Sequence, residues 1–339
     1  DCKKEATYDA VSDFARVEEE LPEPSLDWGK EDLPDDRTVH QLCFADGSMQ
    51  PGGLDSKDGH RPSVDRALLE CLDKTCRVIS SSLGSFDPYD WRPKHGPGAV
   101  SDLKRGSYKY RFPSWSLRLS TVFPYADFAF ANYSAWSDEY DPNLTEDDTS
   151  SSKLISVPKT QRSPRLIASE PTAHQWCQQI VWDFLETRIS HTWIKNFVHF
   201  RDQSYNQRAA RRASKNNDFW TVDLSSASDR VSLRLVERMF KSNVGLLRSL
   251  HSSRTRFLSQ EIDKKTKSHF ELKKFSTMGS ACTFPVESII FLAVAIAATL
   301  HSKGISNVNA RSINRYCQGV LVFGDDCVVP STAGKMFEG

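Results

Sequence analysis

The chain has 339 residues, of which 39% are hydrophobic and 26% charged, and its 44 basic and 44 acidic side chains cancel to a formal net charge of zero. This length is enough for a large core and about two or three subdomains. The longest apolar run, 289–300, has twelve residues and is too short to span a bilayer, and the eight dispersed cysteines include no CxxC pair. A membrane protein and a disulfide framework are therefore excluded, and reduced thiols are expected.

The charge is distributed unevenly along the chain. Residues 1–60 contain 16 acidic and 6 basic side chains, whereas residues 153–215 contain 11 basic and 4 acidic ones. The neutral total therefore hides a basic segment that could face a polyanion, although a solvated surface explains such a segment equally well.

Apolar periodicity and turn residues predict the elements in chain order. The acidic N-terminal segment is predicted to be a peripheral arm with one helix near 8–21. Helical spacing predicts further helices at 62–83, 174–193, 231–240 and 283–301. A buried strand is predicted at 219–224, a hairpin at 254–274, and a second hairpin at 320–329. The second hairpin has two adjacent acids at its turn.

These acids, Asp325 and Asp326, follow Gly324 between two apolar runs. Two adjacent carboxylates repel each other unless a divalent cation compensates them. A third, Asp223, ends the predicted strand before them, so three oxygen ligands converge at one sheet edge if the strands are neighbours. Such ligands suit Mg²⁺, and two ions there could activate a hydroxyl and stabilise a departing pyrophosphate.

Four ordered segments then resemble a known family. TVDLSSASDRVS (221–232), STMGSACTFPVES (276–288) and VFGDDCVVP (322–330) resemble motifs A, B and C of viral RNA-dependent RNA polymerases. The residues of these segments are similar to those in the replicases of positive-strand RNA bacteriophages, the Qβ and MS2 group. The basic segment VPKTQRSPR (157–165), which leads into ASEP (168–171), resembles the fingers motif of that group. The resemblance covers roughly residues 87–331.

The resemblance implies an α+β fold: a right-hand polymerase with an antiparallel palm sheet packed on helices and a fingers subdomain. The implied division is an N-terminal arm and helical region (1–86), a fingers-like region (87–218) and a palm (219–339). Only 13 residues follow Asp326, so the thumb and C-terminal part are expected to be largely absent. The chain is therefore expected to be a fragment of a replicase, which by itself need not be active.

The resemblance also implies roles for single residues. Asp223, Asp325 and Asp326 become the catalytic, metal-binding acids, with two Mg²⁺ ions as cofactors and Mn²⁺ as a possible substitute. Asp326 is expected further from the metals than the other two. Asp229 is implied to accept a hydrogen bond from the ribose 2′-OH, although an acid favoured at a helix N-terminus explains it as well.

The remaining implied nucleotide-binding residues are Lys159, Arg162, Arg165, Gly279, Ser280, Thr283 and Glu287. The cations would neutralise the triphosphate, and the glycine and serine would let the backbone approach the nucleotide or template. Thr283 could equally be a plain N-cap. Glu287 stands where many eukaryotic-virus polymerases carry Asn. A basic patch near Tyr205 is expected to hold RNA phosphates and comprises Arg201, Arg208, Arg211 and Arg212.

The expected function is RNA-directed RNA polymerisation that replicates a phage RNA genome in the cytoplasm of a bacterial host. The implied partners are template and nascent RNA, NTPs, and the host elongation factors Tu and Ts with a ribosomal RNA-binding protein. A reverse transcriptase is the close rival, but it usually has a bulky steric gate near motif A, where this chain has Ser228 and Asp229. An inactive RNA-binding module and a two-metal nuclease are two further interpretations of the same residues.

Overall fold

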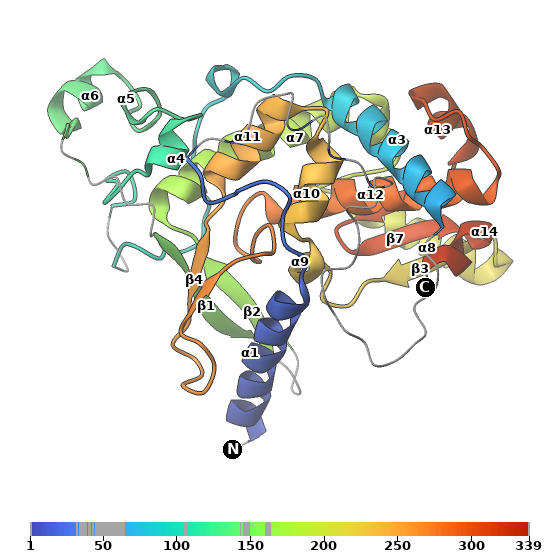
Figure 1. Cartoon of the computed structure of the whole chain (residues 1–339), viewed down its shortest axis with the longest axis horizontal. Coiled ribbons are helices and arrows are strands. Elements are labelled where there is room, and N and C mark those ends of the chain that lie inside the picture. Colours follow the sequence, from blue (N-terminus) through green and yellow to red (C-terminus); the bar gives the residue numbers. More distant parts are fainter. Residues whose placement is uncertain are drawn as a thin grey trace.

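The structure is a computed structural model, which describes residues 2–31, 33, 39, 42, 44, 65–104, 108–142, 144, 150–159 and 164–337. It has a mixed α+β architecture with many helices and two small sheets (Figure 1). The α-helices are α1 Cys2–Glu20, α3 Arg66–Leu83, α4 Leu117–Ser120, α5 Tyr125–Phe128, α6 Tyr133–Glu139, α7 Thr172–His191, α8 Ser204–Asn216, α9 Ala227–Arg230, α10 Leu233–Phe240, α11 Val244–Ser253, α12 Thr283–Ser302, α13 Ala310–Tyr316 and α14 Ser331–Gly334. Short 3₁₀ turns are η1 Pro88–Asp90, η2 Trp193–Asn196 and η3 Lys335–Phe337.

The strands form two separate sheets. They are β1 Ser151–Pro158, β2 Pro164–Ser169, β3 Phe219–Asp223, β4 Phe257–Ser259, β5 His269–Glu271, β6 Leu321–Phe323 and β7 Asp326–Pro330. The three-stranded sheet has the order β3-β7-β6 and is antiparallel throughout. The four-stranded sheet has the order β2-β1-β4-β5, in which only the β1–β4 pair is parallel. Both predicted hairpins are thereby confirmed.

Side-chain caps fix the starts of two helices a few residues inside the predicted ranges. Asp65 accepts hydrogen bonds from the backbone N–H groups of Ala67 and Leu68 at the start of α3. Ser232 caps α10 in the same way, and its hydroxyl accepts the N–H of Leu235. Such caps satisfy N–H groups that have no partner inside the helix. Gly84, with φ +76°, ends α3 in a conformation that favours glycine.

The predicted strand at 219–224 is confirmed as β3, but the expectation that it is buried is wrong. Thr221 and Asp223 are exposed, and the other residues of β3 are only partly buried. The reason is the strand order, because β3 lies at an edge of its sheet and has a neighbour on one side only. The central strand β7 is the buried one, and the side chains of 327–329 along it are all buried.

Helices α8 and α12 both contact the three-stranded sheet, and α3 crosses α12 (Figure 1). Almost every side of α12 is buried, including Ile289, Ala293 and Leu300. The main hydrophobic core surrounds this helix and includes residues from α3, α7, α10 and α11. The apolar run that the sequence contains is therefore the centre of the fold, as expected for a helix that is hydrophobic all round.

The predicted N-terminal helix is confirmed as α1, which projects from one edge of the molecule (Figure 1), but the segment that follows it packs into the core. Leu26 and Trp28 lie in the main core. Glu237 of α10 anchors them, because its buried carboxylate accepts the N–H groups of Ser25 (2.9 Å) and Leu26 (2.8 Å) and the indole N–H of Trp28 (2.7 Å). Three donors on one carboxylate offset the cost of burying its charge.

The implied boundaries at residues 86 and 218 stay predictions. Strand β1 pairs with β4 through the register Ser151↔Phe257, so the four-stranded sheet draws on segments from both sides of residue 218. Helix α1 in turn packs on β2 and α9. The chain segments that the sequence separates thus share layers in the structure.

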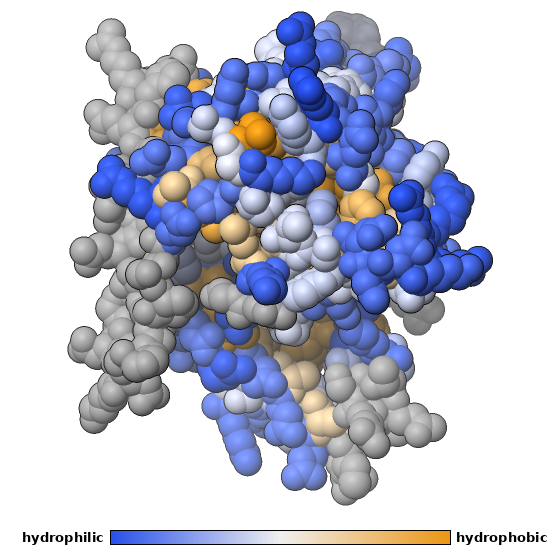
Figure 2. All heavy atoms as spheres, turned by 90° about the vertical axis from the view of Figure 1, so that its right-hand side faces the viewer, coloured by the Kyte–Doolittle hydropathy of each residue, from blue (hydrophilic) through white to orange (hydrophobic). Residues whose placement is uncertain are grey.

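Helix α12 is long and apolar enough to cross a membrane by length and composition alone, with 83% of its most apolar window buried inside the protein. The uninterrupted apolar run is shorter than the helix that contains it. The buried core helix of a protein outside the membrane can have the same length and apolar composition, so these two properties are weak evidence for a membrane span. The face at the right-hand side of Figure 1 is mostly hydrophilic, with small separate apolar spots (Figure 2).

Candidate active site

The second hairpin places the adjacent acids beside β3. Asp326 begins β7 and lies directly opposite Asp223 in the antiparallel register, while Asp325 lies in the turn. Gly324 has φ +61°, and a Cβ there would lie 2.9 Å from the Phe284 ring. The turn therefore needs a glycine both for its backbone conformation and for its contact with α12. The strands that carry Asp223 and Asp326 are therefore neighbours, which was the condition for the acids to lie at one edge of a sheet.

Electrostatics show that the three acids interact. Burial raises the pKa of Asp325, and the charges of Asp326 and Asp223 raise it further. The ammonium of Lys159 acts in the opposite direction on the same pKa. The carboxylate of Asp325 is therefore exposed to the fields of two like charges and of one cation that follows β1. Like charges held together in this way favour a bound cation.

Asp326 is engaged on the α8 side of the sheet. The amide of Gln203 donates to its carboxylate at 2.7 Å, and Asn206 donates to its backbone carbonyl at 2.9 Å. A cavity of about 230 Å³ lies there, lined also by Thr221 and Asp223. One carboxylate oxygen of Asp326 is thus engaged by Gln203, and its expected place further from the metals stays a prediction.

Glu287 brings a fourth acid to the same place. It lies on α12, is only 6% exposed, and has its pKa raised to about 8 by burial and by the charges of Asp325 and Asp229. Its buried Oε2 atom has no hydrogen-bond partner among the described residues. A buried polar atom without a partner is costly, so this carboxyl is suited to a ligand or a cation.

The donor set fits a hard divalent cation. It consists of carboxylate oxygens that repel one another and a buried carboxyl oxygen without a partner among the described residues. Within the described ranges, however, no three His, Cys, Asp or Glu side chains lie close enough together to form a ready-made metal cluster. Mg²⁺ needs only one or two protein carboxylates, because water and phosphate oxygens complete its shell.

Asp229 lies on the short helix α9 and is partly buried. The ammonium of Lys274 donates to its Oδ1 atom at 2.9 Å. Lys274 is fully buried and also lies 3.5 Å from a carboxylate oxygen of Glu18 on α1. The sequence does not predict the contact between Glu18 and Lys274, because the two residues are 256 positions apart and no local pattern indicates such a contact.

The loop that resembles motif B is held against β2. Gly279 has φ +148°, and a Cβ there would lie 1.7 Å from the carbonyl oxygen of Ala168. The N–H of Ala168 donates to the carbonyl of Met278 at 2.7 Å. The glycine therefore permits a close backbone approach to strand β2, and the predicted approach to a nucleotide or template stays a prediction.

Two buried side chains fasten this loop further. Gln178 of α7 accepts the N–H of Ala281 at 3.2 Å and donates to Glu170 at 2.9 Å. The hydroxyl of Thr277 donates to Glu170 at 3.4 Å. No role was predicted for Glu170, although it lies in the ASEP segment that carries part of the resemblance. Gln178 and Glu170 together join the end of the basic strand β2 to the loop before α12.

Thr283 is not the N-cap of α12, so the interpretation as a plain cap is wrong. The cap position is Cys282, and the helix has no side-chain cap. The Thr283 hydroxyl instead donates to the carbonyl of Thr277 at 2.7 Å and contacts Ser276 at 2.7 Å. Ser280 accepts the N–H of Cys282 at 3.2 Å. Both hydroxyls thus shape the loop rather than the helix end.

The basic hairpin formed by β1 and β2 presents its cations at the surface. Lys159 follows β1, and Arg165 lies on β2 opposite Val157; both are exposed. Arg162 lies outside the described residues. The effect of Lys159 on the pKa of Asp325 places it within electrostatic reach of the acids.

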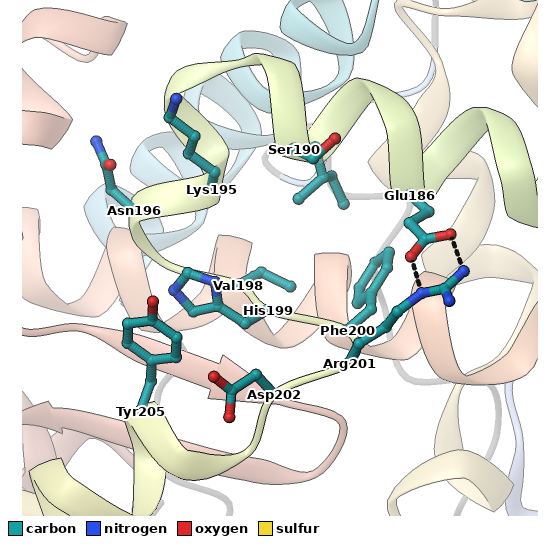
Figure 3. Close-up of a pocket in the computed structure, with 11 residues that line it drawn as sticks. Glu186, Ser190, Lys195, Asn196, Val198, His199, Phe200, Arg201, Asp202 and Tyr205 are labelled. Atoms are coloured by element: carbon teal, nitrogen blue, oxygen red, sulfur yellow. Dashed lines mark hydrogen bonds and ion pairs between the residues drawn. The ribbon is translucent and has the colours of Figure 1, made fainter.

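The members of the basic patch near Tyr205 differ in their partners, and Arg201 lies before α8 while the other three arginines lie on it. Arg201 forms a two-point ion pair with Glu186, with its Nη2 atom 2.6 Å from Oε2 (Figure 3). Tyr205 stacks on His199, with ring centroids 3.8 Å apart, and Arg208 lies 4.6 Å from the Tyr205 ring. These residues, apart from Arg208, line a cavity of about 620 Å³. The last two members of the patch, 211 and 212, are exposed on the same helix.

Comparison with known proteins identifies the family. The family described as RNA replicase, beta-chain matches residues 68–337. The chain is 28% identical over 280 residues to the RNA-directed RNA polymerase subunit beta of Qbeta virus (strain MX1), across 81% of this chain and 44% of that protein. It is 34% identical over 180 residues to the RNA-directed RNA polymerase beta chain of Escherichia phage MS2, across 52% of this chain and 28% of that protein. The chain belongs to the RNA replicase beta-chain family.

The match agrees with the resemblance stated from the sequence and favours a polymerase over a reverse transcriptase or a nuclease. The chain spans less than half the length of the curated relatives it matches.

Proposed function

We propose that the protein is the catalytic part of an RNA-directed RNA polymerase that copies a phage RNA genome. The observation that carries the proposal is the arrangement of Asp223, Asp325 and Asp326, which lie on neighbouring strands and their turn inside a chain of the replicase family. Carboxylates in register across a sheet are difficult to explain by stability alone, because their charges oppose each other.

Asp223 and Asp325 would hold Mg²⁺, with Asp326 beside them. Two such ions supply activation of an attacking 3′-hydroxyl and neutralisation of the leaving pyrophosphate. The chain's own residues would do the rest. Lys159 and Arg165 of the basic hairpin would bind the triphosphate, together with Arg162, because an incoming nucleotide carries several negative charges.

Sugar recognition would fall to Asp229. Lys274 donates to the Oδ1 atom of Asp229, and the Asp229 side chain remains 31% exposed. Its other carboxylate oxygen can therefore accept the ribose 2′-OH. Glu287, whose pKa responds to both Asp229 and Asp325, would sit behind the nucleotide. The loop residues Gly279, Ser280 and Thr283 would shape the surface that the nucleotide or template approaches. The exposed arginines on α8 would hold RNA phosphates.

The test is incorporation of labelled NTPs by the full-length protein on an RNA template with Mg²⁺. The proposal predicts product that requires template and all four NTPs and disappears with a chelator. Template-independent labelling, or degradation of the RNA, would contradict it. The same proposal includes a location in the bacterial cytoplasm and three host partners: elongation factors Tu and Ts and a ribosomal RNA-binding protein. Adding the purified factors to this assay tests whether RNA synthesis depends on them.

A further inference from the structure

The ammonium of Lys274 lies in a closed environment at the junction of three chain segments. Its side chain has no solvent exposure. It contacts Asp229 at 2.9 Å, Glu18 at 3.5 Å and the face of the Phe14 ring, whose centroid lies 3.4 Å away. Two of these partners belong to α1 and one to α9. Burying an ammonium is costly unless carboxylates and hydrogen bonds compensate it, and here two carboxylates do so.

Glu18 is itself fixed in place. Its Oε1 atom accepts the backbone N–H groups of Lys273 and Lys274, the second at 3.2 Å. Glu18 is only 5% exposed. A second contact joins the same elements, because Arg230 of α9 lies 3.7 Å from Glu20 of α1. Helix α1 is therefore bound both to the segment that carries Lys274 and to the helix that carries Asp229.

We propose that Lys274 is a positioning residue for Asp229, and that Glu18 and Phe14 of α1 hold Lys274 in place. The inference rests on the proposed function, in which Asp229 recognises the ribose 2′-OH. The bond from Lys274 fixes one carboxylate oxygen and leaves the other to face the sugar. The N-terminal helix thereby contributes to the discrimination between ribonucleotides and deoxyribonucleotides.

A surface ion pair next in the chain supplies a matched control. Lys273 pairs with Glu23, and both side chains are partly or largely exposed. Exposed pairs of this kind contribute little. Lys273→Met removes one ammonium from the same segment without touching Asp229, so it separates a general loss of charge from the loss of the Lys274 contact.

The experiment measures single-nucleotide incorporation of GTP and 2′-dGTP by the full-length protein, as the ratio of their kcat/KM values. Loss of a hydrogen bond to a charged group predicts that Lys274→Met lowers this ratio by roughly tenfold or more. Glu18→Gln should lower it by a smaller factor, and Lys273→Met should leave it unchanged. A merely structural role would reduce incorporation of both nucleotides equally and leave the ratio intact.

A double-mutant cycle decides whether Lys274 acts through Asp229. Asp229→Asn should lower the ratio, and adding Lys274→Met should lower it no further. An unchanged ratio in Lys274→Met, or additive losses in the double variant, would overturn the inference. The proposed function would still stand in that case, provided that the unaltered protein incorporates GTP. If Lys274→Met fails to fold, Glu18→Gln decides, because it keeps the ammonium, and an unchanged ratio there overturns the role of α1. Failure of the unaltered protein to incorporate GTP would contradict the proposed function itself.

Discussion

Asp223 and Asp326 face each other across the antiparallel strands β3 and β7. Directly opposed side chains on such a pair lie on one face of the sheet and within interaction distance, so like charges there are destabilising. Asp325 in the adjoining turn adds to this repulsion, because its pKa is raised by burial and then further by the charges of Asp326 and Asp223. The site therefore holds negative charges that repel one another at the place where the proposed function needs a cation.

Glu287→Gln should stabilise the metal-free protein. Burial and the charges of Asp325 and Asp229 raise the pKa of Glu287 to about 8, and the folded state must either take up a proton or hold a buried charge. A neutral amide removes that cost, so the free energy of unfolding at pH 8 in EDTA should rise by roughly 1–3 kcal/mol. Urea unfolding of both proteins measures it. A less stable variant would mean that the carboxylate makes favourable contacts.

Gly279→Ala should be severely destabilising. The new Cβ would lie 1.7 Å from the backbone oxygen of Ala168, in a conformation that L side chains rarely adopt. A loss of roughly 3 kcal/mol or more is expected from overpacking together with backbone strain. Gly304→Ala is the matched control, because Gly304 also has positive φ but nothing lies within 4 Å of a Cβ there. Equal melting temperatures for the two variants would refute the close packing of the loop on β2.

The sequence was most informative where structure is local. The hairpin around Gly324 and the helix containing Ile289 followed from apolar runs and turn residues, because these patterns act over a few positions. Contacts between distant segments left no such pattern. The Glu18 carboxylate contacts Lys274, and the Glu170 carboxylate accepts a hydrogen bond from Thr277, only after the chain has folded.

Arg211 and Arg212 should contribute more to RNA binding than Arg201. Both are exposed and form no ion pair within the described part of the chain, whereas Arg201 is paired with Glu186. Replacing both with Ala should make the negative slope of log affinity against log salt concentration shallower by roughly 1.4, since each phosphate contact with single-stranded RNA contributes about −0.7. Filter binding at several salt concentrations measures this. A larger effect from Arg201→Ala would contradict the ranking.

The ion pair of Arg201 illustrates a limit of reading charge from sequence. A cluster of arginines predicts a basic surface, yet the net charge available to a ligand depends on acids that the fold brings nearby. Glu186 lies on α7, and its approach to Arg201 depends on the path of the chain through η2. The same reasoning explains Thr283, whose hydroxyl meets Thr277 across the loop instead of capping its own helix.

Two buried histidines should make the protein less stable in mild acid. Burial and the charges of Arg118 and Arg254 lower the pKa of His251 to about 3, and burial and the same arginines lower that of His174 to about 4. Between those values and the ordinary pKa of about 6.5, the unfolded state binds protons that the folded state does not, so stability falls as pH falls. The full stability is present above about pH 6.5.

His251→Asn isolates one of these groups, because asparagine does not titrate. The fall in unfolding free energy between pH 7 and pH 5 should be smaller in the variant by roughly 1–2 kcal/mol. Urea unfolding at the two pH values gives the difference. The same pH dependence in both proteins would show that His251 does not remain neutral in the folded state.

Primer extension on an RNA template with Mg²⁺ and four NTPs tests the central claim most directly. The full-length protein is compared with Asp223→Asn, Asp325→Asn and the control Asp218→Asn, which alters an exposed acid just before β3. The acids at the hairpin are proposed to hold the catalytic ions, so the first two variants should lose at least ~100-fold in rate while the control keeps its rate. Full synthesis by Asp223→Asn or Asp325→Asn would contradict the assignment of the active site.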